Sequence, residues 1–182
     1  MMKVPHFDKV NLQRIRAKFF GNKHRATLHI PFIERSVAHT LCVIGQNPSA
    51  ADELNADKTV RYLERYVFEK QSQYSQILML NLYSRVDTKK SEKSDLNHPD
   101  CDRLLREAIA QHQNFLIVFG RLTNQGAYKF PERVRELHPL FAGKNVYKLD
   151  TGDSYAPHPG NQSICYNNYN LEVTEYDFSD VY

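Results

Sequence analysis

Apolar residues gather in short blocks along the chain, and their spacing predicts five strands. Near-continuous apolar runs at 41–44, 77–80 and 115–119 are typical of parallel strands that are covered on both faces. Residues 25–32 alternate between apolar and polar positions, and 145–149 form a further short apolar run. Each of these segments is therefore expected to contribute a strand to one sheet.

Helical spacing of apolar residues separates these strands, at about 59–71, from Pro99 onward and after Pro131. Strands that alternate with helices build a largely parallel sheet with right-handed crossovers. The sequence predicts an α/β fold, a three-layer α/β/α arrangement around a mainly parallel sheet of four to five strands. With 182 residues, the chain suits a single domain, 1–182.

The two ends of the chain carry opposite charge. Residues 1–25 hold seven Lys or Arg against one acid, whereas 166–182 hold four acids and no Lys or Arg. The first 24 residues are either a basic arm that tracks nucleic-acid phosphates or an amphipathic helix over about 8–20. The candidate phosphate contacts in this arm are Arg14, Arg16 and Lys18. Alternation over 171–178 predicts that the acidic C-terminal segment forms an edge strand.

Several classes of protein are disfavoured by the sequence. It contains no apolar run of the roughly 20 residues that cross a bilayer and no secretory signal, so we expect a cytoplasmic protein without a membrane partner. Cys42, Cys101 and Cys165 form no CxxC pair, which argues against a disulfide framework, a zinc site or an iron–sulfur cluster. Phosphate-loop, dinucleotide-binding and metalloprotease motifs are also missing. We therefore expect no metal and no cofactor, and the sequence leaves the oligomeric state open.

Three polar residues follow predicted strands or lie in a late loop: Asn47, Asn81 and His158. Ligands of open α/β sheets bind beyond the carboxyl ends of the strands. We therefore expect these three side chains to line a common cavity, although more than a hundred residues separate the first from the last.

The segments that carry these residues read VIGQNPSAAD, ILMLN, VFG and HPGNQS. Their succession resembles the motifs of the uracil-DNA glycosylase superfamily, whose first loop reads GQDPY or GINPG and whose last loop reads HPS. The matching positions are Gly45, Gln46, Asn47, Pro48, Asn81, Gly120, His158 and Pro159. NPSAAD together with the D-x-T at 57–59 resembles more closely a family known as domain of unknown function 1643, mostly small bacterial and phage-associated proteins.

The broader resemblance implies cleavage of an N-glycosidic bond in nucleic acid or a nucleotide. In that chemistry His158 stabilises the charge on the leaving base. Asn81 either reads the edge of the base or satisfies the backbone of a neighbouring loop. Asn47 stands where the most active glycosylases have an aspartate, and its amide is able to position water but not to accept a proton as a general base.

The remaining expectations concern the residues around these three. Gly45, Gln46, Pro48, Ser49, Gly120 and Pro159 are expected to contact the substrate, and Ser49 and Asp52 to cap the helix that follows. Gly160 replaces the phosphate-contacting serine of the HPS motif, which leaves Asn161, Gln162 or Ser163 to contact the backbone phosphate. No leucine wedge follows, so single-stranded nucleic acid or a free nucleotide fits better than duplex DNA. The alternative function is a non-catalytic binder of nucleic acid or nucleotide with the same fold.

Overall fold

The structure is a computed structural model that describes residues 4–35, 39–87, 89–165 and 170–182. Within these residues, seven strands form one sheet in the order β1-β2-β4-β3-β5-β6-β7. Their bounds are Arg16–Phe20 (β1), His24–Pro31 (β2), Thr40–Gly45 (β3), Gln76–Asn81 (β4), Asn114–Ile117 (β5), Asn145–Leu149 (β6) and Val173–Glu175 (β7). The mixed α/β class is confirmed, but the prediction of four to five strands was too low.

The middle of the sheet is parallel and its borders are antiparallel. β3 pairs in parallel with β4 and β5, and β5 pairs in parallel with β6. β2 runs antiparallel to β4, β1 antiparallel to β2, and β7 antiparallel to β6. β7 is the edge strand expected in the acidic C-terminal segment. As a result, the carboxyl ends of β3, β4, β5 and β6 share one edge with the amino end of β2.

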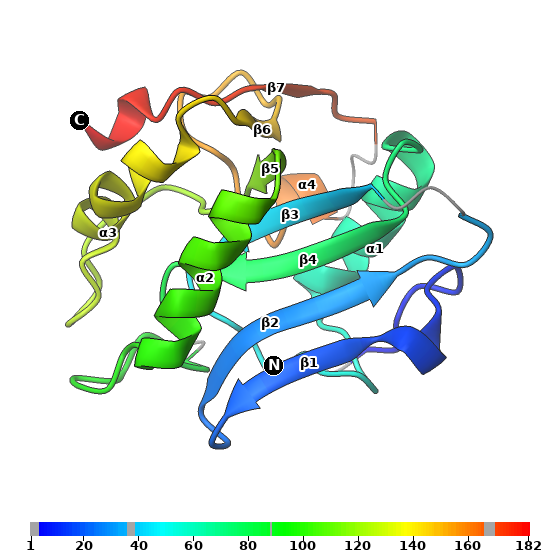
Figure 1. Ribbon diagram of the computed structural model, residues 1–182. Coiled ribbons are helices and arrows are strands. Elements are labelled where there is room, and N and C mark those ends of the chain that lie inside the picture. Colours follow the sequence, from blue (N-terminus) through cyan, green and yellow to red (C-terminus); the bar gives the residue numbers. More distant parts are fainter. Residues whose placement is uncertain (1–3, 36–38, 88, 166–169) are drawn as a thin grey trace.

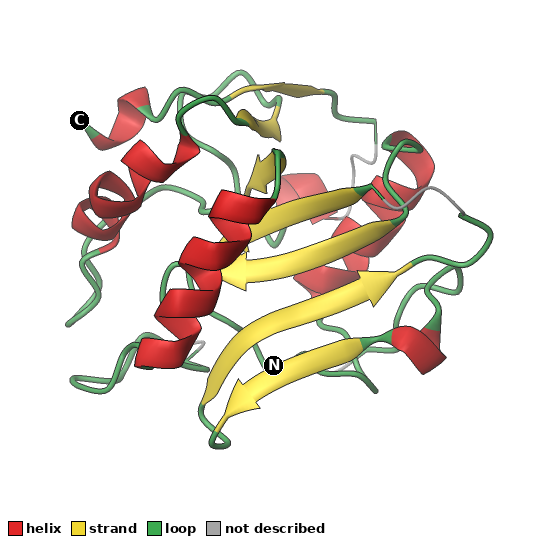
Figure 2. Ribbon diagram, viewed as in Figure 1, coloured by secondary structure: helices red, strands yellow, loops and turns green. Residues whose placement is uncertain are grey.

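Helices cover both faces of the sheet (Figures 1 and 2). The α-helices are Lys58–Lys70 (α1), Pro99–Gln111 (α2), Phe130–Leu137 (α3) and Gln162–Cys165 (α4), and the 3-10 helices are Leu12–Arg14 (η1), His138–Phe141 (η2) and Ser179–Val181 (η3). One core forms where apolar residues of α1 and α4 pack on the sheet, and a second where those of α2 and α3 pack on the opposite face. Because the central strands are buried between two cores, they read as continuous apolar runs.

The amphipathic helix predicted over about 8–20 was wrong. This stretch forms η1 and then β1, an edge strand whose side chains are largely exposed. Val10 and Ile15 are buried as apolar anchors, whereas Leu12 is 61% exposed and Phe19 is 38% exposed. The helical spacing rested on five apolar residues, Val10, Leu12, Ile15, Phe19 and Phe20, of which only two lie in the core. Hydrogen bonding to β2 therefore overrides this spacing.

The N-terminal segment is tied to the loop that precedes α1. Val4 and Ala56 exchange two backbone hydrogen bonds, of 3.0 and 2.9 Å. His6 and Glu64 of α1 form an ion pair whose side chains are completely buried, with 2.5 Å between Nδ1 and Oε1. The second ring nitrogen of His6 donates to the carbonyl of Asp52 at 2.9 Å. These contacts fix the loop 46–57, which also forms part of the candidate site.

No helix in the described part of the chain is long and apolar enough to cross a membrane.

Candidate functional site

A pocket of about 380 Å³ opens at the edge where β3, β4 and β5 end. Seven of the residues expected from the sequence line it: Gly45, Gln46, Asn47, Ser49, Asn81, Gly120 and His158. The expected convergence of two amides and one imidazole is thus a feature of the structure. The pairing of Gly45 with Asn81 in the parallel register brings the first two loops together. The hydrogen bond from Gly120 N–H to Ala156 O, 2.8 Å long, ties the loop of His158 to the end of β5.

The other expected residues lie away from the pocket lining. Pro48 and Pro159 are buried in their loops. Asn161 is exposed beside α4, and the side chain of Ser163 lies outside the described part of the structure. Three basic residues are exposed on η1 and on the edge strand β1, and they do not line the pocket. They are Arg14, Arg16 and Lys18.

The side-chain amide of Asn47 is held by its nitrogen, which leaves its oxygen available as an acceptor. Its Nδ2 donates to the carbonyl of Asp87 at 2.5 Å and to that of Arg85 at 3.5 Å. These two acceptors fix which end of the amide is nitrogen, and an aspartate here would place a carboxylate against two carbonyls. Oδ1 is buried and has no hydrogen-bond partner among the described residues. Asn47 therefore presents an acceptor for water or substrate, as an amide at this position is expected to do.

Asn81 ends β4 with its side chain beside Gly45. A Cβ added to Gly45 would lie 3.3 Å from Asn81 Oδ1, so glycine provides the close approach. Asn81 is only 9% exposed, and its Nδ2 has no hydrogen-bond partner among the described residues. If Asn81 served only to satisfy the backbone of a neighbouring loop, its side-chain nitrogen would be hydrogen-bonded to that loop. The free donor instead suits contact with a ligand.

His158 is held in one neutral tautomer. The Gly160 N–H donates to His158 Nδ1 at 3.0 Å, so Nδ1 carries no proton and Nε2 carries the N–H. The protein atoms around the ring lower the pKa of His158 by desolvation, and Lys90 adds to this effect while Asp57 opposes it. Although the side chain is exposed at the pocket mouth, it is thus neutral at physiological pH and donates through Nε2.

Two glycines shape the space around this imidazole. Gly120 has a φ of +71°, and a Cβ there would lie 3.1 Å from His158 Cβ. A Cβ on Gly160 would lie 2.8 Å from His158 Nδ1 and 3.2 Å from Thr59 Oγ1. The glycine that replaces the serine of the HPS motif is therefore required by the position of the ring.

Gly160→Ser recreates the HPS motif and is expected to impair the site. The new Cβ would displace the imidazole and weaken the hydrogen bond that fixes its tautomer. We expect the His158 pKa, followed by NMR titration of the ring, to rise toward its ordinary value of 6.5. Ala142→Ser, at an exposed position with a φ of −56° and outside the pocket lining, is the control. An unshifted titration in Gly160→Ser contradicts the role assigned to this glycine.

Four charged side chains that the sequence reasoning did not select also line the pocket: Arg25, Asp57, Lys90 and Arg121. Arg25 lies near the start of β2, which reaches this edge only because β2 is antiparallel to β4. Lys90 comes from the loop after β4, whose sequence indicated no more than an exposed connection. Desolvation lowers the Lys90 pKa to about 8, against the effect of Asp87.

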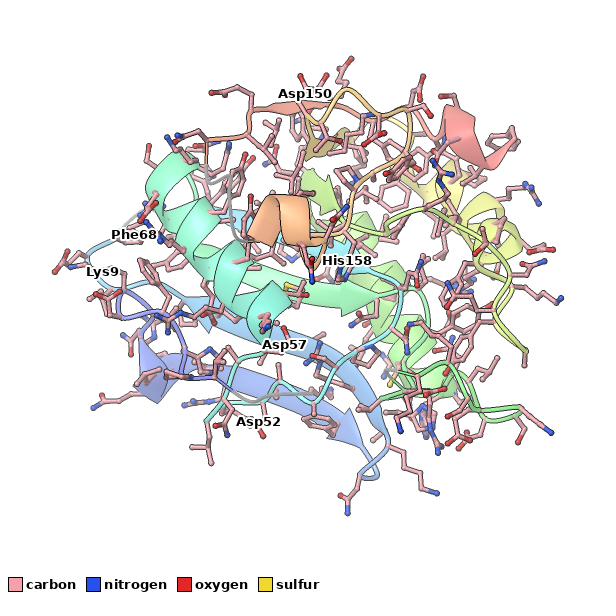
Figure 3. The ribbon with its side chains drawn as sticks, turned by 180° about the vertical axis from the view of Figure 1, so that it is seen from behind. Lys9, Asp52, Asp57, Phe68, Asp150 and His158 are labelled. Carbon is pink, nitrogen blue, oxygen red and sulfur yellow. The ribbon has the colours of Figure 1, made fainter. Side chains whose placement is uncertain are left out.

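Asp57 caps α1, contrary to the capping expected from Ser49 and Asp52. Its Oδ1 accepts the Val60 N–H at 2.8 Å, which leaves its second oxygen for other donors. Ser49 Oγ instead accepts the Ala51 N–H at 3.3 Å, and Asp52 Oδ1 accepts the N–H groups of Leu54 and Asn55 in a turn. Figure 3 shows Asp57 at the start of α1, on the same face of the sheet as His158. The D-x-T motif was the available sequence signal for this residue.

The described residues contain no cluster of three or more His, Cys, Asp or Glu side chains that could hold a metal ion. Cys42 and Cys101 are buried free thiols, and burial raises the pKa of Cys42 to about 12. The side chain of Cys165 lies outside the described part.

Comparison with known protein families gives a match over most of the chain. The profile of the family described as "Protein of unknown function (DUF1643)" matches residues 32–159. The chain belongs to this family. The matched part of this DUF1643 protein includes the loops of Asn47, Asn81 and His158, whereas Arg25 and β1 precede it. No curated protein and no solved structure matches the chain significantly.

Proposed function

We propose that this DUF1643 protein hydrolyses the N-glycosidic bond of a nucleobase in nucleic acid or a nucleotide, with a three-layer fold like that of uracil-DNA glycosylases. The observation that carries the proposal is the meeting of Asn47, Asn81 and His158 in one pocket at the carboxyl ends of parallel strands. Each of the three offers the hydrogen-bonding group that this chemistry needs.

The leaving base develops negative charge on its carbonyl oxygens, and His158 supplies the donor for it. A neutral imidazole with its proton on Nε2 donates a hydrogen bond to such an oxygen and keeps the proton. Its tautomer is set in advance by the Gly160 N–H, so no reorganisation is needed during the reaction. Gly120 leaves room for the His158 side chain beside the end of β5.

We assign to Asn47 the positioning of the attacking water and to Asn81 the recognition of the edge of the base. Asn47 Oδ1 accepts a hydrogen bond from water and orients it, while the fixed Nδ2 holds the amide in place. Because an amide does not take the proton, we assign its acceptance to the carboxylate of Asp57, which lines the same pocket. Asn81 Nδ2 donates to an acceptor on the base.

The test is a mass-spectrometric screen for released bases. Substrates are single-stranded and duplex oligonucleotides, nucleosides and nucleotides that carry normal or modified bases. We expect release from at least one substrate, and a fall of about 10²-fold in the single-turnover rate of Asn47→Ala, because the water is no longer positioned. Asn124→Ala, in an exposed loop away from the pocket, is the control.

The alternative, a non-catalytic binder, is favoured if no substrate is cleaved above background while a ligand still binds in the pocket. Salt-dependent binding of oligonucleotides that falls when Arg14, Arg16 and Lys18 are neutralised would place a nucleic acid on the N-terminal segment instead.

A further inference from the structure

One buried cation in the pocket, Arg25, forms no ion pair with any residue that the structure describes. Arg25 is 2% exposed, and its Nη1 donates to the carbonyl of Ala51 at 2.7 Å. Its Nε has no hydrogen-bond partner among the described residues. Desolvation lowers the Arg25 pKa to about 10, while Asp57 and Asp52 act in the opposite direction. The side chain therefore remains charged at neutral pH.

Holding a loop at one carbonyl does not require a charge. A buried ion without a close counter-ion destabilises the folded state, and proteins keep such groups where a ligand or a reaction uses them. An anion bound in the pocket would balance the guanidinium and give Nε the acceptor that it lacks.

The rest of the lining also favours an anion. Lys90 and Arg121 add two cations, Asp57 is the one carboxylate among the described lining residues, and His158 is neutral. Lys90 Nζ is held 5.2 Å from the ring centre of Phe130 and 5.7 Å from that of Tyr128. The pocket thus combines positive charge with the amides that the proposed function assigns to a base.

We propose that the pocket binds a free mononucleotide, with the terminal phosphate toward Arg25 and the base toward Asn81. The base half of this proposal rests on the proposed function. Guanidinium groups match the geometry of phosphate oxygens, and a pocket of about 380 Å³ lies within the range of small-molecule sites, roughly 300–1,000 Å³.

The burial of Arg25 distinguishes a mononucleotide from a polynucleotide. An internal phosphodiester continues into chain on both sides, so a site that holds it must be open in both directions, as in the grooves that track a nucleic-acid backbone. A terminal phosphate is bonded to the rest of the nucleotide on one side only, so it is able to enter a pocket that is closed at its far end. Arg25 is enclosed, whereas the exposed basic residues of β1, Arg16 and Lys18, do not line the pocket.

The test compares matched ligands by isothermal titration calorimetry on the full chain. The probes are deoxyuridine and the four common deoxynucleosides, their 5′-monophosphates, orthophosphate, and a single-stranded oligonucleotide of the same bases. At least one monophosphate is expected to bind roughly 30-fold or more tightly than its nucleoside, since a buried charged contact is gained. That monophosphate should also bind more tightly than either orthophosphate or the oligonucleotide.

Variants then assign the preference to Arg25. In Arg25→Met, which keeps much of the side-chain volume, the advantage of the monophosphate over the nucleoside should fall to near one. Arg14→Met, which removes an exposed arginine of η1, should keep it. If Arg25→Met does not fold, as judged by circular dichroism, the comparison of ligands on the unaltered protein decides alone.

The outcomes separate this proposal from the proposed function. Equal affinity for nucleoside and monophosphate, binding of orthophosphate without any nucleotide, or preference for the oligonucleotide each overturns the mononucleotide assignment. Phosphate-dependent binding without base release leaves the mononucleotide site standing and removes the glycosylase. Base release from oligonucleotides without phosphate-dependent binding of a mononucleotide supports the glycosylase and overturns the mononucleotide site.

Discussion

Base release by His158→Phe is expected to fall by about 10²–10³-fold, the usual effect of removing one preorganised donor from a developing oxyanion. Phenylalanine keeps the ring volume beside Gly120 but removes the Nε2–H and the acceptor of the Gly160 N–H. The loss should appear in kcat, with little change in KM, because the donor acts on charge that forms in the transition state. Single-turnover kinetics on the substrate identified by the screen provide the measurement.

The pH profile of the unaltered protein tests the same role. The pKa of His158 is lowered below 6.5, so the neutral donor persists below that pH, and the rate falls only as the pH drops through the lowered pKa. His39→Phe is the matched control, since His39 is exposed just before β3, at the opposite edge of the sheet. A His158→Phe variant as active as His39→Phe would remove His158 from the mechanism.

The largest expected effect on stability is that of His6→Ala, about 3–5 kcal/mol in the free energy of unfolding, because it leaves the buried Glu64 carboxylate without its counter-ion. The Phe7 N–H, 2.8 Å from Glu64 Oε2, would still donate to that carboxylate but carries no compensating charge. Urea unfolding followed by circular dichroism measures the change. His39→Ala is the control and should lie within about 0.5 kcal/mol of the unaltered protein.

The sign of the pH dependence identifies the ion pair. Burial works against protonation of His6, but the hydrogen bond and charge of Glu64, with the Asp52 carbonyl, outweigh it and raise the pKa. The contribution to stability is therefore complete below pH 6.5 and is lost as the pH rises through the raised pKa. His6→Ala should lack this decline. If unaltered protein and variant lose stability in parallel above pH 6.5, the pair is not the cause.

The effect of His6 should extend to the candidate site. Its Nε2 holds the Asp52 carbonyl, and Val4 pairs with Ala56 in the same loop, which also carries Ser49 and Asp57. Loss of the ion pair is thus expected to loosen one wall of the pocket while the sheet remains intact.

The sequence by itself determined the parallel centre of the fold and the loops that carry Asn47, Asn81 and His158. Strands buried on both faces must be apolar throughout, so β3, β4 and β5 were visible as continuous apolar runs. Ligands bind beyond the carboxyl ends of such strands, so Asn47 and Asn81 were expected to line a site there. Helices α1, α2 and α3 were visible for a similar reason, since each presents one apolar stripe to a core.

Only the tertiary structure decided which distant groups meet. β1 was mistaken for a helix because an edge strand is stabilised by the backbone of its neighbour, which leaves no clear pattern in its own side chains. Arg25 was missed because the antiparallel pairing of β2 brings the start of that strand, rather than its end, to the pocket. The unpaired charge there, and the glycine that fits against His158, depend on contacts in space that no local pattern encodes.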